Sequence, residues 1–160
     1  MTEKKIRRAS LADMDRILEI YALARQFMVD NGNPTQWKNG YPHSDLLVED
    51  IRLGRLYVVC SSGTLCGVFM FRVGDDPTYA HIEGSWRSDM PYGVIHRVAG
   101  VGGGVFAAVL SFCAEQTDHL RIDTHADNLP MQHLVEKAGF SRRGVIYVED
   151  GSPRIAYDRL

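Results

Sequence analysis

Apolar and polar residues alternate with helical spacing near the N-terminus. From residue 11 to residue 28, apolar side chains recur every three or four positions, which predicts a helix with one buried face. The positions on this face are Leu11, Met14, Ile17, Leu18, Tyr21, Ala24 and Met28. Ser10, with Asp13 three residues later, is typical of a helix start.

Turn-forming residues separate the elements around this helix. A short strand over Ile6–Arg8 is expected before it, and residues 31–41, which contain several Asn and Gly, predict a loop after it. Ser44–Leu53 has the pattern of a second, short helix. Leu56–Ser61 and Leu65–Val73 are rich in β-branched and aromatic residues and predict an antiparallel hairpin.

Strands and helices alternate in the second half of the chain. The expected elements are a strand or extended segment over Tyr79–Trp86, a strand over Val94–Ala99, a helix from Gly103 or Gly104 to Gln116, a strand over His119–Thr124, a helix over Asn128–Ala138, and strands over Val145–Glu149 and Arg154–Asp158. This order predicts an α/β protein with a mixed sheet and helices on its faces.

Length and charge narrow the classes of function. A chain of 160 residues has the size of one domain, so we expect a single domain over residues 1–160. Eighteen Lys and Arg against 20 Asp and Glu give a formal net charge of −2. Because a nucleic-acid-binding protein needs a basic surface, we expect no nucleic-acid partner.

The cysteines and hydropathy indicate the compartment. Cys60, Cys66 and Cys113 are odd in number and lie in apolar stretches, which favours reduced thiols and a cytoplasmic location. No run of 18 apolar residues occurs, so no membrane association is expected. The histidines and cysteines show no zinc spacing, and no metal is expected.

A glycine-rich loop joins the strand at Val94–Ala99 to the following helix. Glycines let several backbone N–H groups approach an anion, and the helix N-terminus adds partial positive charge. No Gly-Lys-Ser/Thr follows the loop, which excludes the P-loop type, and Val105 stands where a dinucleotide-binding fingerprint needs glycine. Coenzyme A remains as a diphosphate carrier that the loop could bind.

Two elements of the chain resemble the GNAT acetyltransferase superfamily. The segment from Val101 to Phe106 stands at the position of the family's Arg/Gln-x-x-Gly-x-Gly/Ala loop, and Asn128 to Phe140 resembles its Asn…Glu-Lys-x-Gly-Phe element. Three further segments, Tyr92–Val98, Arg121–His125 and Asp150–Arg154, look like a bacterial branch of small GNAT proteins with unassigned acceptors. The resemblance implies the GNAT fold, a mostly antiparallel mixed sheet of six or seven strands.

The resemblance also implies a binding site for acetyl-CoA as co-substrate. The backbone of Val98 and Ala99 would pair with the pantetheine arm, and the backbone donors of the loop would bind the diphosphate: Gly102, Gly103, Gly104 and Val105. Asn128 would line the groove, and as a residue type it is equally a helix N-cap. Val101 replaces the usual Arg or Gln, which removes one charge-assisted contact and predicts weaker binding.

Acetyl transfer to an amine needs a proton acceptor, because an alkyl ammonium has a pKa of about 10.4. Glu83 and His96 are the first candidates for this base, since each lies on a predicted strand near the acetyl site. Asp123 and His125 are second candidates. Hydrogen bonding within the sheet for His96, and solvation for Glu83, stay open as structural alternatives.

The proton donor to the leaving thiolate has a weaker sequence signal. Val135 stands where many GNAT proteins carry a tyrosine, so Tyr147, and after it Tyr157, are candidates for this role. Core packing is the alternative for both tyrosines. Trp37 and Tyr41 are candidates for binding the acceptor through cation–π contacts, with closure of the core as the alternative.

These expectations converge on an acetyl-CoA-dependent N-acetyltransferase. The expected acceptor is the primary amine of a small molecule, which attacks directly in a ternary complex. A protein or peptide acceptor, or a non-catalytic module that binds acyl-CoA, stays open as an alternative. The oligomeric state also stays open, with a homodimer as one option.

Overall fold

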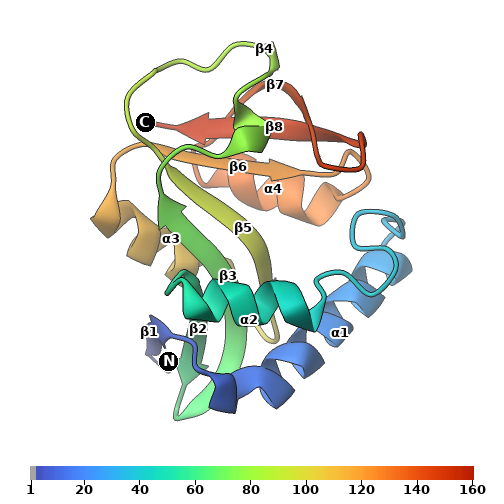
Figure 1. Ribbon diagram of the computed structural model, residues 1–160, viewed down its shortest axis with the longest axis vertical. Helices are drawn as coiled ribbons and strands as arrows, with labels where there is room; N and C mark the ends of the chain where they lie inside the picture. The colour runs from blue at the N-terminus through green and yellow to red at the C-terminus, as the bar shows by residue number, and fades with distance from the viewer. Residues whose placement is uncertain (1–2) are drawn as a thin grey trace.

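The computed structural model describes residues 3–160 and places a single sheet at the centre of the fold (Figure 1). Within these residues the strands are β1 (Lys4–Arg8), β2 (Leu56–Ser61), β3 (Thr64–Val73), β4 (Glu83–Gly84), β5 (Gly93–Gly100), β6 (Leu120–Thr124), β7 (Ser141–Tyr147) and β8 (Pro153–Arg159). The helices are α1 (Met14–Asp30), α2 (Ser44–Arg52), α3 (Val105–Gln116) and α4 (Leu129–Lys137), with 3-10 turns η1 (Leu11–Asp13) and η2 (Pro77–Tyr79). No helix of residues 3–160 is long and apolar enough to cross a membrane.

The strands follow the order β1-β2-β3-β5-β6-β8-β7-β4 across the sheet. Every neighbouring pair is antiparallel except β5 and β6, which run parallel and are connected through α3. This parallel pairing is short, since it joins only Gly93 to Leu120 and Val94 to Arg121. Beyond Val94, β5 and β6 diverge, and an opening forms in the middle of the sheet.

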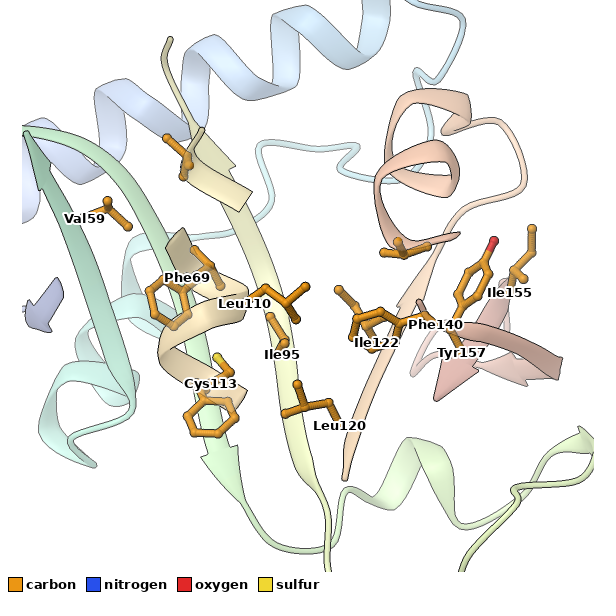
Figure 2. Close-up of a cluster of buried hydrophobic side chains, with 14 residues drawn as sticks. Val59, Phe69, Ile95, Leu110, Cys113, Leu120, Ile122, Phe140, Ile155 and Tyr157 are labelled. Carbon is orange, nitrogen blue, oxygen red and sulfur yellow. The ribbon is translucent and has the colours of Figure 1, made fainter. Parts of the chain in front are cut away.

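The two faces of the sheet carry different helices. Helices α1 and α2 cover β2, β3 and β5 on one face, and α3 and α4 cover the other (Figure 1). On the second face, Leu110 and Cys113 of α3 lie beside Phe69 and Ile95, and the core continues through Ile122 beneath α4 (Figure 2). Alternation along each strand explains this division, because successive side chains point to opposite faces.

The helical region begins after Ser10 as predicted, but in the turn η1 that leads into α1, and the buried face of α1 is narrower than predicted. The backbone N–H of Ser10 donates to the Asp13 carboxylate at 2.8 Å, as a capping box requires. Ile17 and Tyr21 are fully buried, whereas Leu11 and Leu18 are exposed. Leu11 lies in η1, before the regular helix begins, so helical spacing counted from it does not define the buried face.

Helix α3 begins very close to the sheet. A Cβ on Gly100 would lie 2.8 Å from Val105, and one on Gly67 would lie 2.7 Å from the same side chain. Glycine at both positions therefore lets the first turn of α3 pack directly against β3 and β5. This close approach places the N-terminus of α3 beside the end of β5.

Three details of the fold differ from the sequence-based prediction. The sheet has eight strands within residues 3–160 rather than six or seven. Residues 79–86, expected as a strand or extended segment, start in the turn η2 and form only the two-residue strand β4. Strand β7 begins at Ser141, four residues before its predicted start, because a bulge near Gly144 interrupts the regular alternation.

Candidate active site

A cavity of about 600 Å³ opens where β5 and β6 diverge. It lies on the sheet face that carries α1 and α2, and it extends through the opening to Met131 of α4. Polar and charged side chains supply much of its wall, among them Lys38, His43, Arg55, Arg72, Asp76, His96, Arg97, Asp123, Asn128, Glu149, Asp150 and Arg154. A volume of this size accommodates a small molecule.

His96 lies between two carboxylates in this cavity. Its Nε2 is 2.7 Å from Oδ2 of Asp76, and its Nδ1 is 3.6 Å from Oδ2 of Asp123. Asp76 also accepts hydrogen bonds from the backbone N–H and the hydroxyl of Thr78. The Tyr79 hydroxyl donates to Asp123 at 2.7 Å.

The electrostatics of this cluster fix the tautomer of His96. Burial alone would raise the pKa of Asp76, but the hydrogen bond and charge of His96, with help from Thr78, lower it below its ordinary value. Asp76 is therefore an ionised acceptor, and Nε2 of His96 must donate to it. Burial, together with Asp123, raises the pKa of Tyr79 well above its ordinary value, so the Tyr79 hydroxyl keeps its proton.

The arrangement leaves two acceptors facing one point of the cavity. In the neutral imidazole with Nε2 protonated, Nδ1 of His96 has a lone pair that can accept a proton, and Oδ2 of Asp123 lies 3.6 Å from it. An ammonium or amine between them could donate to both atoms. A base oriented by a buried carboxylate is the usual arrangement for general-base catalysis.

A bulge in β5 shapes the wall next to His96. Met70 pairs with His96 and Val68 with Ala99, so β5 has one more residue than β3 between these pairs. Arg97 in the bulge has a φ of +55°, and its carbonyl accepts a hydrogen bond from Tyr21 at 2.8 Å. The bulge turns the edge of β5 towards the opening.

The Arg97 side chain is held by a buried carboxylate of α2. Asp50 is completely buried; it accepts from Nε of Arg55 at 2.7 Å and also pairs with Arg97. The Arg97 guanidinium donates to the Tyr41 hydroxyl at 3.3 Å. This network connects α2 to β5 and gives two arginines of the cavity wall one shared anionic partner.

The residues predicted to contact acetyl-CoA lie along one path. Val98 and Ala99 follow the last position at which β5 pairs with β6, so β6 covers neither of them. After them, Gly102 and Gly104 have φ values of +79° and +81°, and Gly104 caps α3. Within residues 3–160, the backbone N–H groups of residues 102–105 have no hydrogen-bond acceptor. These open donors fit a diphosphate.

A cation lies beside this loop although the sequence pattern gave none. The Lys4 ammonium of β1 is 3.3 Å from the point that a Cβ of Gly104 would occupy. Lys4 thus approaches the loop from a neighbouring strand, whereas Val101, at the family's cationic position, supplies only its backbone. Sequence reasoning missed Lys4 because nothing in a basic N-terminus indicates which strand edge it will face.

Trp37, Tyr41 and Asn128 all line the cavity. Trp37 also packs edge-on against Tyr21, with ring centroids 5.5 Å apart, so it closes the core as well. Asn128 caps α4 by accepting from the Met131 N–H at 3.2 Å, and its amide donates to Gln36. Trp37 and Asn128 therefore have the structural roles considered as alternatives, and contact of the three residues with a ligand stays a prediction.

The other two predicted catalytic residues lie elsewhere. Glu83 and Tyr147 meet at the outer edge of the sheet, where the tyrosine hydroxyl donates to the carboxylate at 2.9 Å, and both are exposed. The expectation that Glu83 lies near His96 is corrected, because η2 redirects the chain and β4 pairs with β7 instead of β5. Neither residue lines the cavity.

Of the second candidates for proton transfer, one lies in the cavity and two do not. Asp123 is part of the cluster, whereas His125 lies outside the cavity lining and contacts Thr35 at 3.1 Å. Tyr157 is fully buried in the core beneath α4, which matches its structural alternative. Asp76 was missed, although Asp76-Pro77 is a turn signal that places the aspartate immediately before η2.

Comparison with solved structures supports the fold. No family model matches the sequence, and no curated protein matches it significantly. Among solved structures, a GNAT family acetyltransferase of Streptococcus agalactiae has 29% identity and a TM-score of 0.89, covering 98% of this chain and 95% of that one. A putative acetyltransferase of Staphylococcus aureus has 25% identity and a TM-score of 0.68, covering 96% and 97%. This chain has the fold of the GNAT acetyltransferases, and these neighbours support its membership of the GNAT superfamily.

The GNAT fold predicted from the two motifs is thereby confirmed, with eight strands. A more distant GNAT-like fold is Naa50 of Arabidopsis thaliana in complex with the bisubstrate analogue CoA-Ac-MVNAL. It has 9% identity and a TM-score of 0.64, and the alignment covers 98% of each chain. At this identity the comparison concerns the fold alone.

Proposed function

We propose that this GNAT protein transfers the acetyl group of acetyl-CoA to the primary amine of a small molecule. The observation that carries the proposal is the position of His96, held between Asp76 and Asp123 at the point where β5 and β6 diverge. The cavity around this point has the volume of a small-molecule site. The open amides of residues 102–105 fit the diphosphate of the co-substrate.

The residues of the cavity suggest how the proton is handled. The acceptor enters as an ammonium that donates to Nδ1 of His96 and to Oδ2 of Asp123. His96 takes one proton, and Asp123 and Asp76 stabilise the resulting imidazolium. The free amine then forms a bond to the thioester carbonyl carbon while the carbon–sulfur bond breaks. Solvent or the imidazolium returns a proton to the leaving thiolate, and the nitrogen releases its second proton to solvent.

The test is the release of the CoA thiol from acetyl-CoA in the presence of primary amines. We expect at least one small amine to accelerate release well above the rate in buffer. His96→Ala should remove the acceleration while acetyl-CoA binding, measured by calorimetry, persists. Failure of every amine to accelerate release would contradict the proposal.

The same assay separates the alternatives. Peptides with free N-termini and with internal lysines are included as acceptors. Acetylation of peptides alone would indicate a protein acetyltransferase. Saturable binding of acetyl-CoA with no turnover on any acceptor would indicate a non-catalytic acyl-CoA-binding module.

A further inference from the structure

Arg154 is a buried cation of the cavity wall with no anionic partner. Only 8% of the residue is exposed. Its guanidinium donates to two backbone carbonyls, those of Pro153 at 2.8 Å and of Gln36 at 3.4 Å. No carboxylate of residues 3–160 lies within 4 Å of it.

Three other charged residues of the cavity wall have partners of opposite charge. Arg55 and Arg97 share the buried carboxylate of Asp50. Asp150, at the mouth of the cavity, is 3.7 Å from the Lys38 ammonium and accepts a hydrogen bond from the Ser152 hydroxyl. Arg154 thus differs from Arg55 and Arg97, whereas Arg72 of the same wall also has no carboxylate of residues 3–160 within 4 Å and donates to the Asp75 carbonyl.

A buried charge without a partner is unfavourable unless a ligand supplies the opposite charge. Removal of a charged group from water is strongly unfavourable, and two carbonyl contacts recover only part of this cost. A guanidinium presents paired N–H donors in one plane, which match the two oxygens of a carboxylate or phosphate. The wall around Arg154 is therefore suited to an oxyanion.

The position of Arg154 on β8 sets the distance between such an oxyanion and the reacting amine. On β8, Ala156 pairs with Asp123 of β6, and Arg154 lies two residues before Ala156 on the same face of the sheet. Two strand residues span about 7 Å. One molecule could therefore place an amine between His96 and Asp123 and an anionic group at Arg154.

We propose that the acceptor is a primary amine that also carries a carboxylate or phosphate, and that Arg154 binds this oxyanion. This inference rests on the proposed function, because that function places the amine at His96. It adds the chemical class of the acceptor and a residue that selects it. It also predicts that Arg154 has no part in binding acetyl-CoA.

The experiment compares amines that differ only in the anionic group. The pairs are γ-aminobutyrate with propylamine, lysine with cadaverine, and phosphoethanolamine with ethanolamine. We expect kcat/KM for at least one anionic member to exceed that of its neutral or cationic counterpart by about tenfold or more, the value of one charge-assisted contact. The phosphate pair and the carboxylate pairs distinguish the two oxyanions.

Two variants test whether Arg154 produces this preference. Arg154→Gln should reduce the ratio within the preferred pair to about twofold or less, with KM for acetyl-CoA unchanged. Arg142→Gln removes the same charge from an exposed position outside the cavity and should leave the ratio intact. Equal loss on both members of a pair, or a raised KM for acetyl-CoA with the ratio intact, would overturn the inference.

Two measurements keep this inference separate from the proposed function. If no amine is acetylated, the proposed function fails, and calorimetry of the three anionic probes with the CoA-saturated protein decides whether Arg154 binds an oxyanion. Saturable binding that Arg154→Gln abolishes supports it, and no binding by any probe overturns it. The melting temperature of ligand-free Arg154→Gln should be equal to or higher than that of the parent protein. If Arg154 had a purely structural role, the melting temperature of the variant would be lower.

Discussion

Two regions of the sheet contain a carboxylate hydrogen-bonded to a side chain that can carry a proton. His96 and Asp76 are joined at 2.7 Å beside the divergence of β5 and β6, and Tyr147 and Glu83 are joined at 2.9 Å on the outer edge. The first pair lies in a cavity with a second carboxylate, that of Asp123. The second pair is exposed and faces water, which screens its charges and competes for its hydrogen bonds.

This difference shows what makes residues of similar chemistry into a site. Each pair joins a carboxylate to a side chain that can carry a proton, at 2.7 Å and 2.9 Å respectively. Only the buried pair adjoins an opening in the backbone hydrogen bonding of the sheet, where a second molecule could bind. The predictions below compare buried groups near the cavity with exposed groups of matching type.

The largest expected effect concerns the carboxylate that supports the cavity wall. Asp50→Ala leaves Arg55 and Arg97 without their buried partner, and breaking a buried ion pair in this way costs about 3–5 kcal/mol. The free energy of unfolding, measured with urea at pH 7, should fall by that amount. The control is Glu49→Ala, at the residue before Asp50, which breaks an exposed ion pair with Arg52. It should change the free energy of unfolding little. Similar decreases in the free energy of unfolding of both variants would contradict the expected difference between the buried and the exposed carboxylate.

The next effect concerns catalysis. His96→Ala should lower kcat/KM for the fastest amine by about 10²–10³-fold, the usual contribution of a general base. Glu83→Gln and Tyr147→Phe remove groups of the exposed pair and should stay within about twofold of the parent protein. A large loss of kcat/KM in Glu83→Gln or Tyr147→Phe, with kcat/KM of His96→Ala unchanged, would show that the active site lies at the outer edge of the sheet.

The sequence predicted the individual elements of the site better than the contacts between them. The glycine loop and the strand that carries His96 were found because a strand that runs through glycines into a helix has a local signature, whereas Asn128 came from the resemblance of residues 128–140 to a GNAT element. Glu83 was misplaced because its position depends on the turn at Asp76 and on pairing with β7, which is a long-range choice. Lys4 reaches the loop through the β1–β2 pairing, which no local pattern records.

Strand partners explain the remaining differences. Alternating hydrophobicity predicts that a segment is a strand, but it does not specify its neighbour in the sheet. The order β3-β5-β6 leaves β4 at the far edge, and only this order assembles Asp76, His96 and Asp123 around one point. The cluster is thus a product of topology.

A smaller effect is expected when the buried pair is titrated. The lowered pKa of Asp76 means that this ionised carboxylate stabilises the fold above the ordinary aspartate pKa, and that the stabilisation disappears as pH falls below about 4 towards the lower folded value. The melting temperature of the parent protein should therefore fall more steeply between pH 5 and pH 3 than that of Asp76→Asn. Asp89→Asn, which changes an exposed carboxylate outside the cavity lining, should retain the steep profile of the parent protein. Parallel profiles for the parent protein and Asp76→Asn would show that the pair does not stabilise the fold through its charge.

The smallest effect is expected at the diphosphate loop, where the cation is only partly buried. Lys4→Ala removes the ammonium beside Gly104 but leaves the backbone donors of residues 102–105, so KM for acetyl-CoA should rise by about two- to fivefold with kcat unchanged. Because salt screens such a contact, the difference between variant and parent should shrink at 0.5 M NaCl. Lys5→Ala, on the same strand but with its side chain on the other face, is the matched control and should leave KM unchanged. An equal rise in both variants would reflect general charge attraction, whereas a rise in Lys4→Ala alone would show that β1 supplies the cation that Val101 does not.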